Sequence, residues 1–299
     1  MPSLAQTTEL FWGIVGPWMY LSNAFYYLPG TILRLVRAGD VRTLLSPSRL
    51  KDAWFSAFWG WAGPRIRVGQ GDRVVALFEG RVTRGQAVED PVHPPVSGVV
   101  LEIGPGTGLW VNIFSKGSKA DAAADAKQGV VRRRVAEGVT KVYGVEPNTG
   151  AHPALRKRVQ DAGLEGTYEI VPAGIESLSN PAVWDGKIEK GSVDCIVSIL
   201  CLCSIPEPEK NIAELYSYLK KGGRWYLYEH VEVSNSWPIW LYQRFVNLVW
   251  PQALNGCQLC RNTGKTLKSA GPWENIDIVQ PVWEPWFQVV PHIFGTLTK

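Results

Sequence analysis

The chain has 299 residues, enough for one large domain or a domain with an appendage, and its net charge of +4 comes from scattered basic residues. One basic run, residues 130–135, is interpreted as a solvated helix face, so no nucleic-acid partner is predicted. The five irregularly spaced cysteines argue against a disulfide scaffold, and the 14 tryptophans predict apolar surface for a ligand, a membrane or a deep core.

The N-terminal stretch of residues 10–33 carries no charge and is followed by Arg34, Arg37 and Arg42. No basic region precedes it and no small-residue cleavage site follows it, so it does not resemble a secretory signal. It is long enough to span a membrane, and the arginines would then hold the rest of the chain in the cytosol. Alternatively, glycines and prolines break it into a helical lid over an active site, and both interpretations could hold together.

A second aromatic stretch, residues 53–63, is expected to form a short amphipathic element. We assign it with the first stretch to an N-terminal module of residues 1–72, which serves as a lid or as a membrane-association module. Residues 73–299 are expected to form the ligand-binding domain.

From residue 73 onward, apolar runs alternate with helical patterns. The runs are bounded by turn residues and read as strands buried on both faces of a parallel sheet. They lie at residues 98–104, 141–146, 167–173, 193–202 and 224–231, with helices expected at 152–163 and 207–223. Two more strands, 275–282 and 289–299, are close enough to pair. The predicted fold is a doubly wound, Rossmann-like α/β fold, with a mostly parallel seven-stranded sheet and an antiparallel C-terminal hairpin.

The first strand of this sheet leads into a glycine loop, Glu102-Ile-Gly-Pro-Gly-Thr-Gly108. Its spacing differs from the dinucleotide motif, and the absence of Gly-Lys-Ser/Thr excludes a P-loop. An acid two residues before the first glycine suits a cationic ligand better than a pyrophosphate. S-adenosyl-L-methionine, which carries an ammonium and a sulfonium, is therefore the predicted cofactor.

Two further loops are expected at the same edge of the sheet, where ligands of this architecture bind. Glu146 ends the second strand, where a carboxylate can accept hydrogen bonds from ribose hydroxyls, and the loop after the third strand can bracket an adenine. The predicted cofactor-binding residues are Glu102, Gly104, Pro105, Gly106, Gly108, Glu146, Pro147, Asn148, Gly174, Ile175, Glu176, Cys201 and Leu202.

Residues 99–231 are similar to the class I S-adenosylmethionine-dependent methyltransferases. The similarity rests on the order of four motifs: LEIGPGTG, VYGVEPN, AGIESL and the stretch that ends in YEHV. Within that class the chain most resembles the small, membrane-associated thiol methyltransferases of the methyltransferase-like group, through LCS, YEHV, NGCQL and VVPHIFGTLTK. This resemblance implies a place on the cytosolic side of the endoplasmic reticulum membrane or on lipid droplets.

The chain departs from the pattern of this group in three places. Residues 109–140 add length between the first two strands, Cys201 and Cys260 replace expected apolar and hydroxyl residues, and residues 236–252 are unusually aromatic. The cofactor prediction is unaffected, while the substrate stays open.

His230, at the end of the fifth strand, is the predicted catalytic base, with a purely structural histidine as the alternative. An apolar substrate is expected against Cys203 and an aromatic wall, although a plain core helix would show the same aromatic spacing. The predicted wall consists of Trp237, Trp240, Tyr242 and Phe245.

Four cysteines, at positions 201, 203, 257 and 260, raise the question of a zinc site. The C-x-C spacing of Cys201 and Cys203 is tighter than in structural zinc sites, so no metal is predicted. Instead, Cys201 is expected near the cofactor and Cys203 on the substrate side.

The predicted function is S-, O- or C-methylation of a lipophilic small molecule, with natural-product biosynthesis as one setting. The alternative is a cyclase or pericyclase that binds S-adenosylmethionine without transferring its methyl group. A membrane-docked binding module is a third, non-enzymatic interpretation. The sequence leaves the oligomeric state open.

Overall fold

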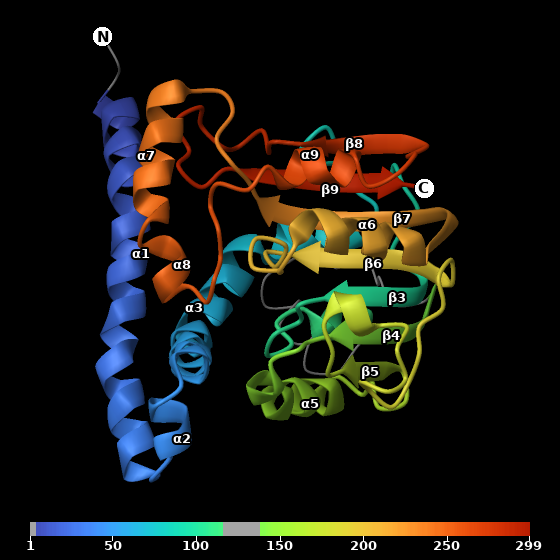
Figure 1. Ribbon diagram of the computed structural model, residues 1–299. Helices are drawn as coiled ribbons and strands as arrows, with labels where there is room; N and C mark the ends of the chain where they lie inside the picture. Colours follow the sequence, from blue (N-terminus) through green and yellow to red (C-terminus); the bar gives the residue numbers. More distant parts are fainter. Residues whose placement is uncertain (1–3, 116–137) are drawn as a thin grey trace.

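A seven-stranded sheet forms the centre of the computed structural model, which describes residues 4–115 and 138–299 (Figure 1). The strand order is β5-β4-β3-β6-β7-β9-β8. The strands are β3 (Gly98–Ile103), β4 (Val139–Val145), β5 (Tyr168–Val171), β6 (Val193–Ile199), β7 (Leu219–His230), β8 (Asn275–Val279) and β9 (His292–Thr298). Neighbours from β5 to β7 pair in parallel, whereas β9 is antiparallel to both β7 and β8. The predicted fold class and C-terminal hairpin are confirmed.

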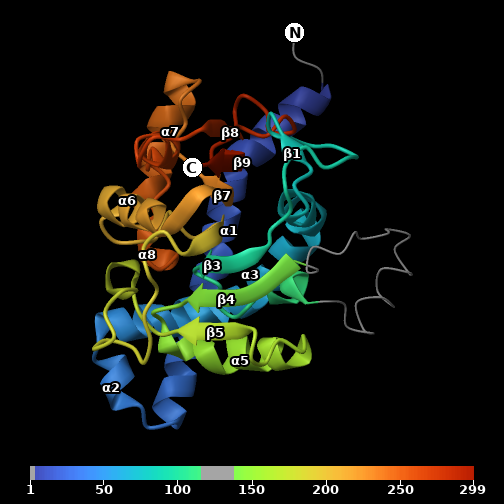
Figure 2. The same ribbon diagram turned by 90° about the vertical axis from the view of Figure 1, so that its right-hand side faces the viewer.

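Successive strand residues point to opposite faces of the sheet, and other elements pack against each face. On one side, Val100 packs with the end of α3 (Pro47–Phe78), with η1 (Val111–Phe114) and with α5 (His152–Asp161). On the other side, the adjacent Leu101 packs with α6 (Pro208–Tyr218) and α9 (Thr263–Lys268). Figure 2 shows this arrangement edge-on. The short strands β1 (Val82–Thr83) and β2 (Gln86–Ala87) form a separate pair.

Two element boundaries differ from the prediction. The strand expected at 193–202 ends at Ile199, because Leu200 adopts a φ of 56° that breaks the extended backbone. The helix expected at 207–223 ends at Tyr218, and Lys220 and Lys221 lie in β7. Leu219 pairs with Val193 of β6, and this strand pairing ends the helix and begins β7.

The N-terminal helix α1 (Leu4–Arg37) is continuous for 34 residues, although Pro17 and Pro29 lie inside it. The predicted break is therefore wrong. Each proline removes one helical hydrogen bond, but packing along the buried face of the helix compensates. Leu21 and Ala24 are buried against the aromatic side chains of α3. Tertiary contacts thus outweigh the local helix-breaking signal.

The expected short element at residues 53–63 is part of the 32-residue helix α3. A short helix α2 (Val41–Leu44) connects α1 to it. Since α3 continues past residue 72, the proposed boundary between the two modules falls inside a helix, and that division stays a prediction. The basic run at 130–135 and most of the added length at 109–140 lie outside the described residues.

Helix α1 also packs against α7 (Trp237–Asn247) and α8 (Trp250–Ala253), as Figure 1 shows. Trp18 Nε1 donates a hydrogen bond of 2.8 Å to the Tyr242 hydroxyl, which itself donates to the Ile14 carbonyl. Among the described helices, none is both long and apolar enough to cross a membrane.

Candidate active site

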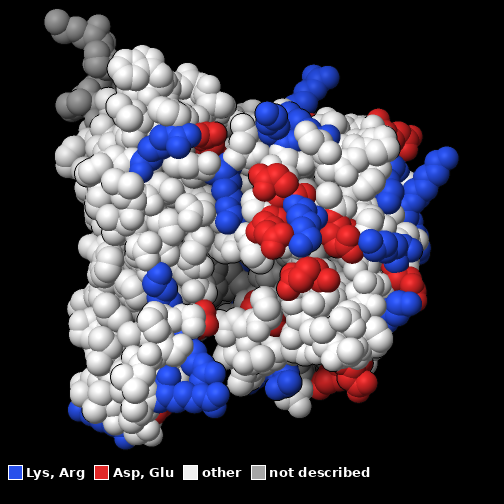
Figure 3. Space-filling model, viewed as in Figure 1, with Lys and Arg blue, Asp and Glu red and all other residues white. Residues whose placement is uncertain are grey.

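A cavity of about 1260 Å³ lies between the carboxyl ends of the sheet strands and the N-terminal helices. The loops after β3, β4, β5 and β6 form one wall, and residues of α1 and α3 form the opposite wall. Figure 3 shows a recess between these two sides of the molecule. The N-terminal helices therefore cover the edge of the sheet where the sequence places the ligand site.

The glycine loop after β3 is shaped by left-handed backbone conformations. Gly104, Gly106 and Gly108 have φ values of 61°, 57° and 83°. A Cβ at Gly104 would lie 2.7 Å from the Cβ of Cys201, so the two loops approach too closely for any side chain. Gly104, Pro105 and Gly106 line the cavity. Gly108 instead lies against Leu155 of α5 and supports the loop from behind.

Glu146 lies beside this loop and lines the cavity. Its carboxylate accepts hydrogen bonds from the backbone N–H groups of Gly106, at 2.8 Å, and Asn148, at 2.9 Å. Burial raises the pKa of Glu146, and these two bonds partly offset the effect. The structure brings together the remaining predicted loop residues here, because Pro147, Asn148, Gly174, Ile175 and Glu176 all line the cavity.

Glu102 lies one layer beneath the cavity rather than in its lining. The Tyr168 hydroxyl donates a hydrogen bond of 2.6 Å to its carboxylate. Burial raises the pKa of Glu102 to about 7, although the bond from Tyr168 opposes the shift. Any effect of this carboxylate on a bound cation is exerted through space.

The charge of the cavity suits a cation. Its described lining includes the carboxylates of Glu9, Asp52, Glu146, Glu176 and Glu284, and it includes no lysine or arginine. A pyrophosphate would be repelled by this surface, whereas an ammonium or sulfonium is attracted. The close-approach glycines and the acidic lining therefore fit S-adenosyl-L-methionine.

Three side chains from separate segments meet at one side of the cavity. Cys203, His230 and Cys257 all line it, and their potential ligand atoms lie within 4.8 Å of one another. His230 Nε2 is 3.0 Å from the Cys257 sulfur. The pKa of the Cys203 thiol lies well above its usual value, because Cys257 bonds to it and because it is buried.

The other two cysteines that raised the question of a zinc site lie apart from this group. Cys201 lines the cavity, but its backbone N–H and thiol bond to the Glu229 carboxylate, as does the backbone N–H of Leu202. Leu202 is fully buried behind the cavity wall, and Cys260 does not line the cavity.

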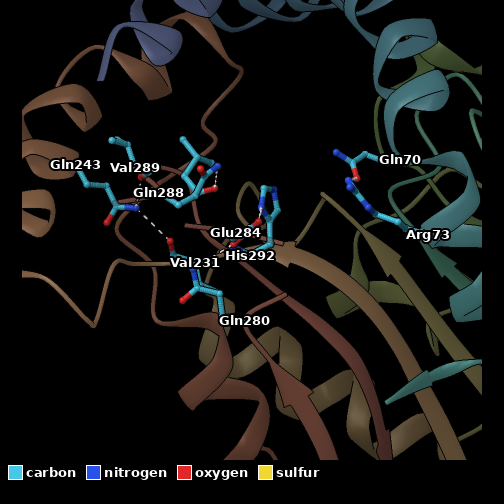
Figure 4. Close-up of polar contacts among 10 residues, drawn as sticks. Gln70, Arg73, Val231, Gln243, Gln280, Glu284, Gln288, Val289 and His292 are labelled. Atoms are coloured by element: carbon cyan, nitrogen blue, oxygen red, sulfur yellow. Dashed lines mark hydrogen bonds and ion pairs between the residues drawn. The ribbon is translucent and has the colours of Figure 1, made fainter. Parts of the chain in front are cut away.

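The sequence did not single out a second polar group, Glu284 with His292. His292 Nδ1 lies 2.5 Å from Glu284 Oε1, and both residues line the cavity (Figure 4). The His292 backbone N–H and the Gln280 amide also donate to this carboxylate. Burial lowers the pKa of His292, which favours the neutral imidazole. A histidine with one nitrogen bonded to a carboxylate and the other free is a candidate proton acceptor.

The pairing of β7 with β9 places His292 of this dyad directly opposite His230. Its ring stacks on Tyr228 at 4.7 Å. A histidine next to Pro291 at the start of a strand gives no such signal in the sequence.

The four aromatic residues predicted as the substrate wall lie outside the cavity lining. They are on α7, where Trp237 and Phe245 are exposed and Tyr242 bonds to α1. Other aromatic residues line the cavity instead. They are Trp12, Tyr20, Phe55, Trp59, Trp110, Trp250, Trp283 and Phe287.

Comparison with known proteins identifies related chains. A family model described as a methyltransferase domain matches residues 84–268. Thiol S-methyltransferase TMT1A of Homo sapiens is 32% identical over 203 residues, which cover 67% of this chain and 70% of that protein. Thiol S-methyltransferase TMT1B of Rattus norvegicus is 33% identical over 164 residues, which cover 53% of this chain. The match spans 62% of the rat protein, less than two thirds of that protein's length.

Among solved structures, the [4+2]-cyclase SpnF is 15% identical, with a TM-score of 0.46 over 76% of this chain and 81% of that one. A similarity at that level does not distinguish methyl transfer from cyclisation. The family match and the thiol methyltransferase relatives do support an assignment. The chain belongs to the methyltransferase domain family and is an S-adenosyl-L-methionine-dependent methyltransferase.

Proposed function

We propose that this protein methylates the sulfur of a lipophilic thiol and that it works at a membrane surface. The observation that carries the proposal is the composition of the cavity, whose lining combines five carboxylates with two histidines and eight aromatic side chains. The names of the related thiol S-methyltransferases support sulfur as the acceptor.

On the cofactor side, Gly104 and Gly106 would bring the backbone close to the donor, and Glu146 would accept hydrogen bonds from ribose hydroxyls. Ile175 and Glu176, which line the same cavity, would bracket the adenine. Bound S-adenosylmethionine supplies an electrophilic methyl group. The acceptor sulfur would bond to this methyl carbon as the bond from the methyl group to the sulfonium breaks, and the electron pair of the broken bond would stay on S-adenosylhomocysteine.

On the acceptor side, the thiol must lose a proton before or during the transfer. A free thiol has a pKa near 8.5, so a modest base is sufficient. Glu284 holds the His292 ring through Nδ1, and no described residue bonds to Nε2, which can take the proton. His230, the base predicted from the sequence, has its Nε2 occupied by Cys257. We therefore assign the base role to His292 and place His230 beside the acceptor.

Membrane contact is proposed for the surface formed by α1 and α7. Large apolar side chains such as Phe11, Tyr26, Trp237 and Leu248 are exposed there. Figure 3 shows few charges on this side, with basic residues gathered at its lower end. Arg34, Arg37, Arg42 and Arg49 are exposed near the end of α1, where anionic lipid headgroups would attract them. The cytosolic face of the endoplasmic reticulum or a lipid droplet would provide such a surface.

The test is an assay of the purified full-length chain with labelled S-adenosylmethionine and a panel of lipophilic thiols, phenols and carbon acids. We expect a thiol to yield its S-methyl product and S-adenosylhomocysteine in a one-to-one ratio. The His292→Gln variant should lower kcat about 100-fold with little change in KM for the donor, because it removes the base and leaves the cofactor loops intact.

The matched control is His93→Gln, since His93 also pairs with a carboxylate, Asp277, but does not line the cavity. Equal activity of the two variants would remove His292 from the mechanism. Turnover without S-adenosylhomocysteine would favour the cyclase alternative, and a methylated phenol or carbon product with no thioether would replace the thiol assignment.

A further inference from the structure

The loops that carry Cys203 and Cys257 meet at the end of β7, where His230 lies. All three side chains are buried, and all three line the cavity. A backbone bond of 3.0 Å from the Gln258 N–H to the Cys203 carbonyl holds the two loops together. The cluster is therefore fixed by main-chain contacts rather than by flexible surface side chains.

We propose that Cys203, His230 and Cys257 bind one zinc ion whose fourth coordination position faces the cavity. Zinc–sulfur and zinc–nitrogen distances of about 2.3 and 2.0 Å at tetrahedral angles require ligand atoms about 3.5 to 3.8 Å apart. The three candidate ligand atoms lie within 4.8 Å of one another, and the 3.0 Å contact between His230 and Cys257 needs to open by only about half an ångström. Two thiolates and one imidazole are a donor set typical of zinc sites that keep a position for substrate.

The surroundings of the cluster support an ion with anionic ligands. Trp250 Nε1 donates a hydrogen bond of 3.2 Å to the Cys257 sulfur. The Arg261 guanidinium, bonded to the Leu202 and Ile205 carbonyls, brings a positive charge near both cysteines. Such contacts stabilise thiolate ligands. The ring nitrogen of His230 that faces the cluster is Nε2, 3.0 Å from the Cys257 sulfur, whereas Nδ1 is buried without a hydrogen-bond partner among the described residues.

The expectation of no metal came from the spacing of four cysteines in two close pairs. The structure separates Cys201 and Cys260 from the cluster and adds a histidine from another strand. The resulting site has three protein ligands rather than four. Three ligands leave the ion open to an external donor, which distinguishes this arrangement from a structural zinc site.

A chemical role for the ion follows, and it rests on the proposed thiol methylation. The acceptor sulfur occupies the fourth position as a thiolate, because metal coordination deprotonates a thiol. Its proton passes to His292, whose ring centroid lies 6.3 Å from that of His230. The thioether product is uncharged and binds the ion more weakly, which favours its release.

The first measurement is the metal content of the reduced, full-length protein by mass spectrometry. We expect about one zinc per chain, and the Cys203→Ser and Cys257→Ser variants should each bind zinc at least 100-fold more weakly. Cys260→Ser is the matched control and should keep its zinc, because Cys260 follows Cys257 closely but lies outside the cluster. Circular dichroism and S-adenosylmethionine binding show which variants are folded.

A second measurement uses the unaltered protein and so does not depend on how the variants fold. Cobalt substituted for zinc should give sulfur-to-metal charge-transfer bands and tetrahedral d–d bands, and a lipophilic thiol should shift them. The absence of metal from reduced protein supplied with zinc would overturn the proposal. So would copper as the native ion, full zinc content in the Cys203→Ser/Cys257→Ser double variant, or a Cys203–Cys257 disulfide that persists when zinc is supplied.

The two proposals can fail separately. Zinc at the cluster without methyl transfer to any thiol would leave the site standing and reject the proposed function. Equal methylation by zinc-loaded and zinc-free protein would keep the function and reject a role for the ion in it.

Discussion

At the scale of single residues, the carboxyl group of Glu102 makes the stability of the protein depend on pH. Its pKa is raised from an ordinary 4.5 to about 7 because the group is buried. A carboxyl whose pKa is raised in the folded state stabilises the fold below its unfolded pKa, and this stabilisation is lost as the pH rises towards 7. The loss amounts to roughly 3 kcal/mol, since one pKa unit corresponds to about 1.4 kcal/mol.

We therefore predict that the cofactor-free protein loses unfolding free energy between pH 5 and pH 8 and that Glu102→Gln flattens this dependence. Glutamine cannot ionise, but it still accepts the hydrogen bond from Tyr168. Urea denaturation at several pH values provides the measurement. Glu169→Gln is the control, because this half-exposed carboxylate pairs with Lys141 on the surface. Parallel curves for wild type and Glu102→Gln would contradict the prediction.

Local sequence places the loops after the strands at the cavity, but it does not reveal which distant side chains meet there. Gly104, Gly106 and Glu146 follow strands directly, so local sequence is enough to place them at the carboxyl edge of the sheet. The approach of Cys203, His230 and Cys257 depends on loops that meet only in the folded chain. No local sequence pattern shows that these three side chains lie close together.

At the scale of elements, the loop between β3 and η1 tests how tightly the cofactor site is built. Gly104→Ala should weaken S-adenosylmethionine binding at least 10-fold, because a Cβ there collides with Cys201 and because its φ of 61° is unfavourable for alanine. Isothermal titration calorimetry measures the affinity.

The control for this variant is Gly163→Ala. Gly163 has a similar φ of 66°, and a Cβ there meets nothing within 4 Å. Both variants should lose about 1 kcal/mol of stability through the backbone conformation alone. Only Gly104→Ala should also lose cofactor affinity, and equal affinity of the two variants would show that the close approach of the loops is unimportant.

The elements themselves were predictable to different degrees. Strands β3 to β7 are recognisable as apolar runs because both faces of a parallel sheet are buried. The continuity of α1 could not be predicted, because Pro17 and Pro29 are local helix breakers and the packing that outweighs them comes from α3 and α7. The end of α6 at Tyr218 is likewise decided by the pairing of Leu219 with β6.

At the scale of the whole molecule, α1 and α3 connect the proposed membrane surface to the cavity. Residues of α1 such as Trp12 and Gly13 line the cavity, while Phe11 and Ile14 are exposed on the same helix. A thiol that partitions into lipid could therefore reach the acceptor side from the membrane.

The last prediction concerns that surface. The full-length protein should sediment with vesicles of phosphatidylcholine and phosphatidylserine. The double variant Trp237→Gln/Leu248→Gln should have a partition coefficient at least 10-fold lower, because burying each large apolar side chain contributes about 1.5 to 3 kcal/mol. Val183→Gln/Ile276→Gln, which removes exposed apolar side chains from a loop and from the edge strand β8, should leave partitioning unchanged. High salt should weaken binding without abolishing it, because the arginines near α2 add an electrostatic part to an apolar contact. Equal partitioning of the two double variants would place the membrane contact elsewhere on the molecule.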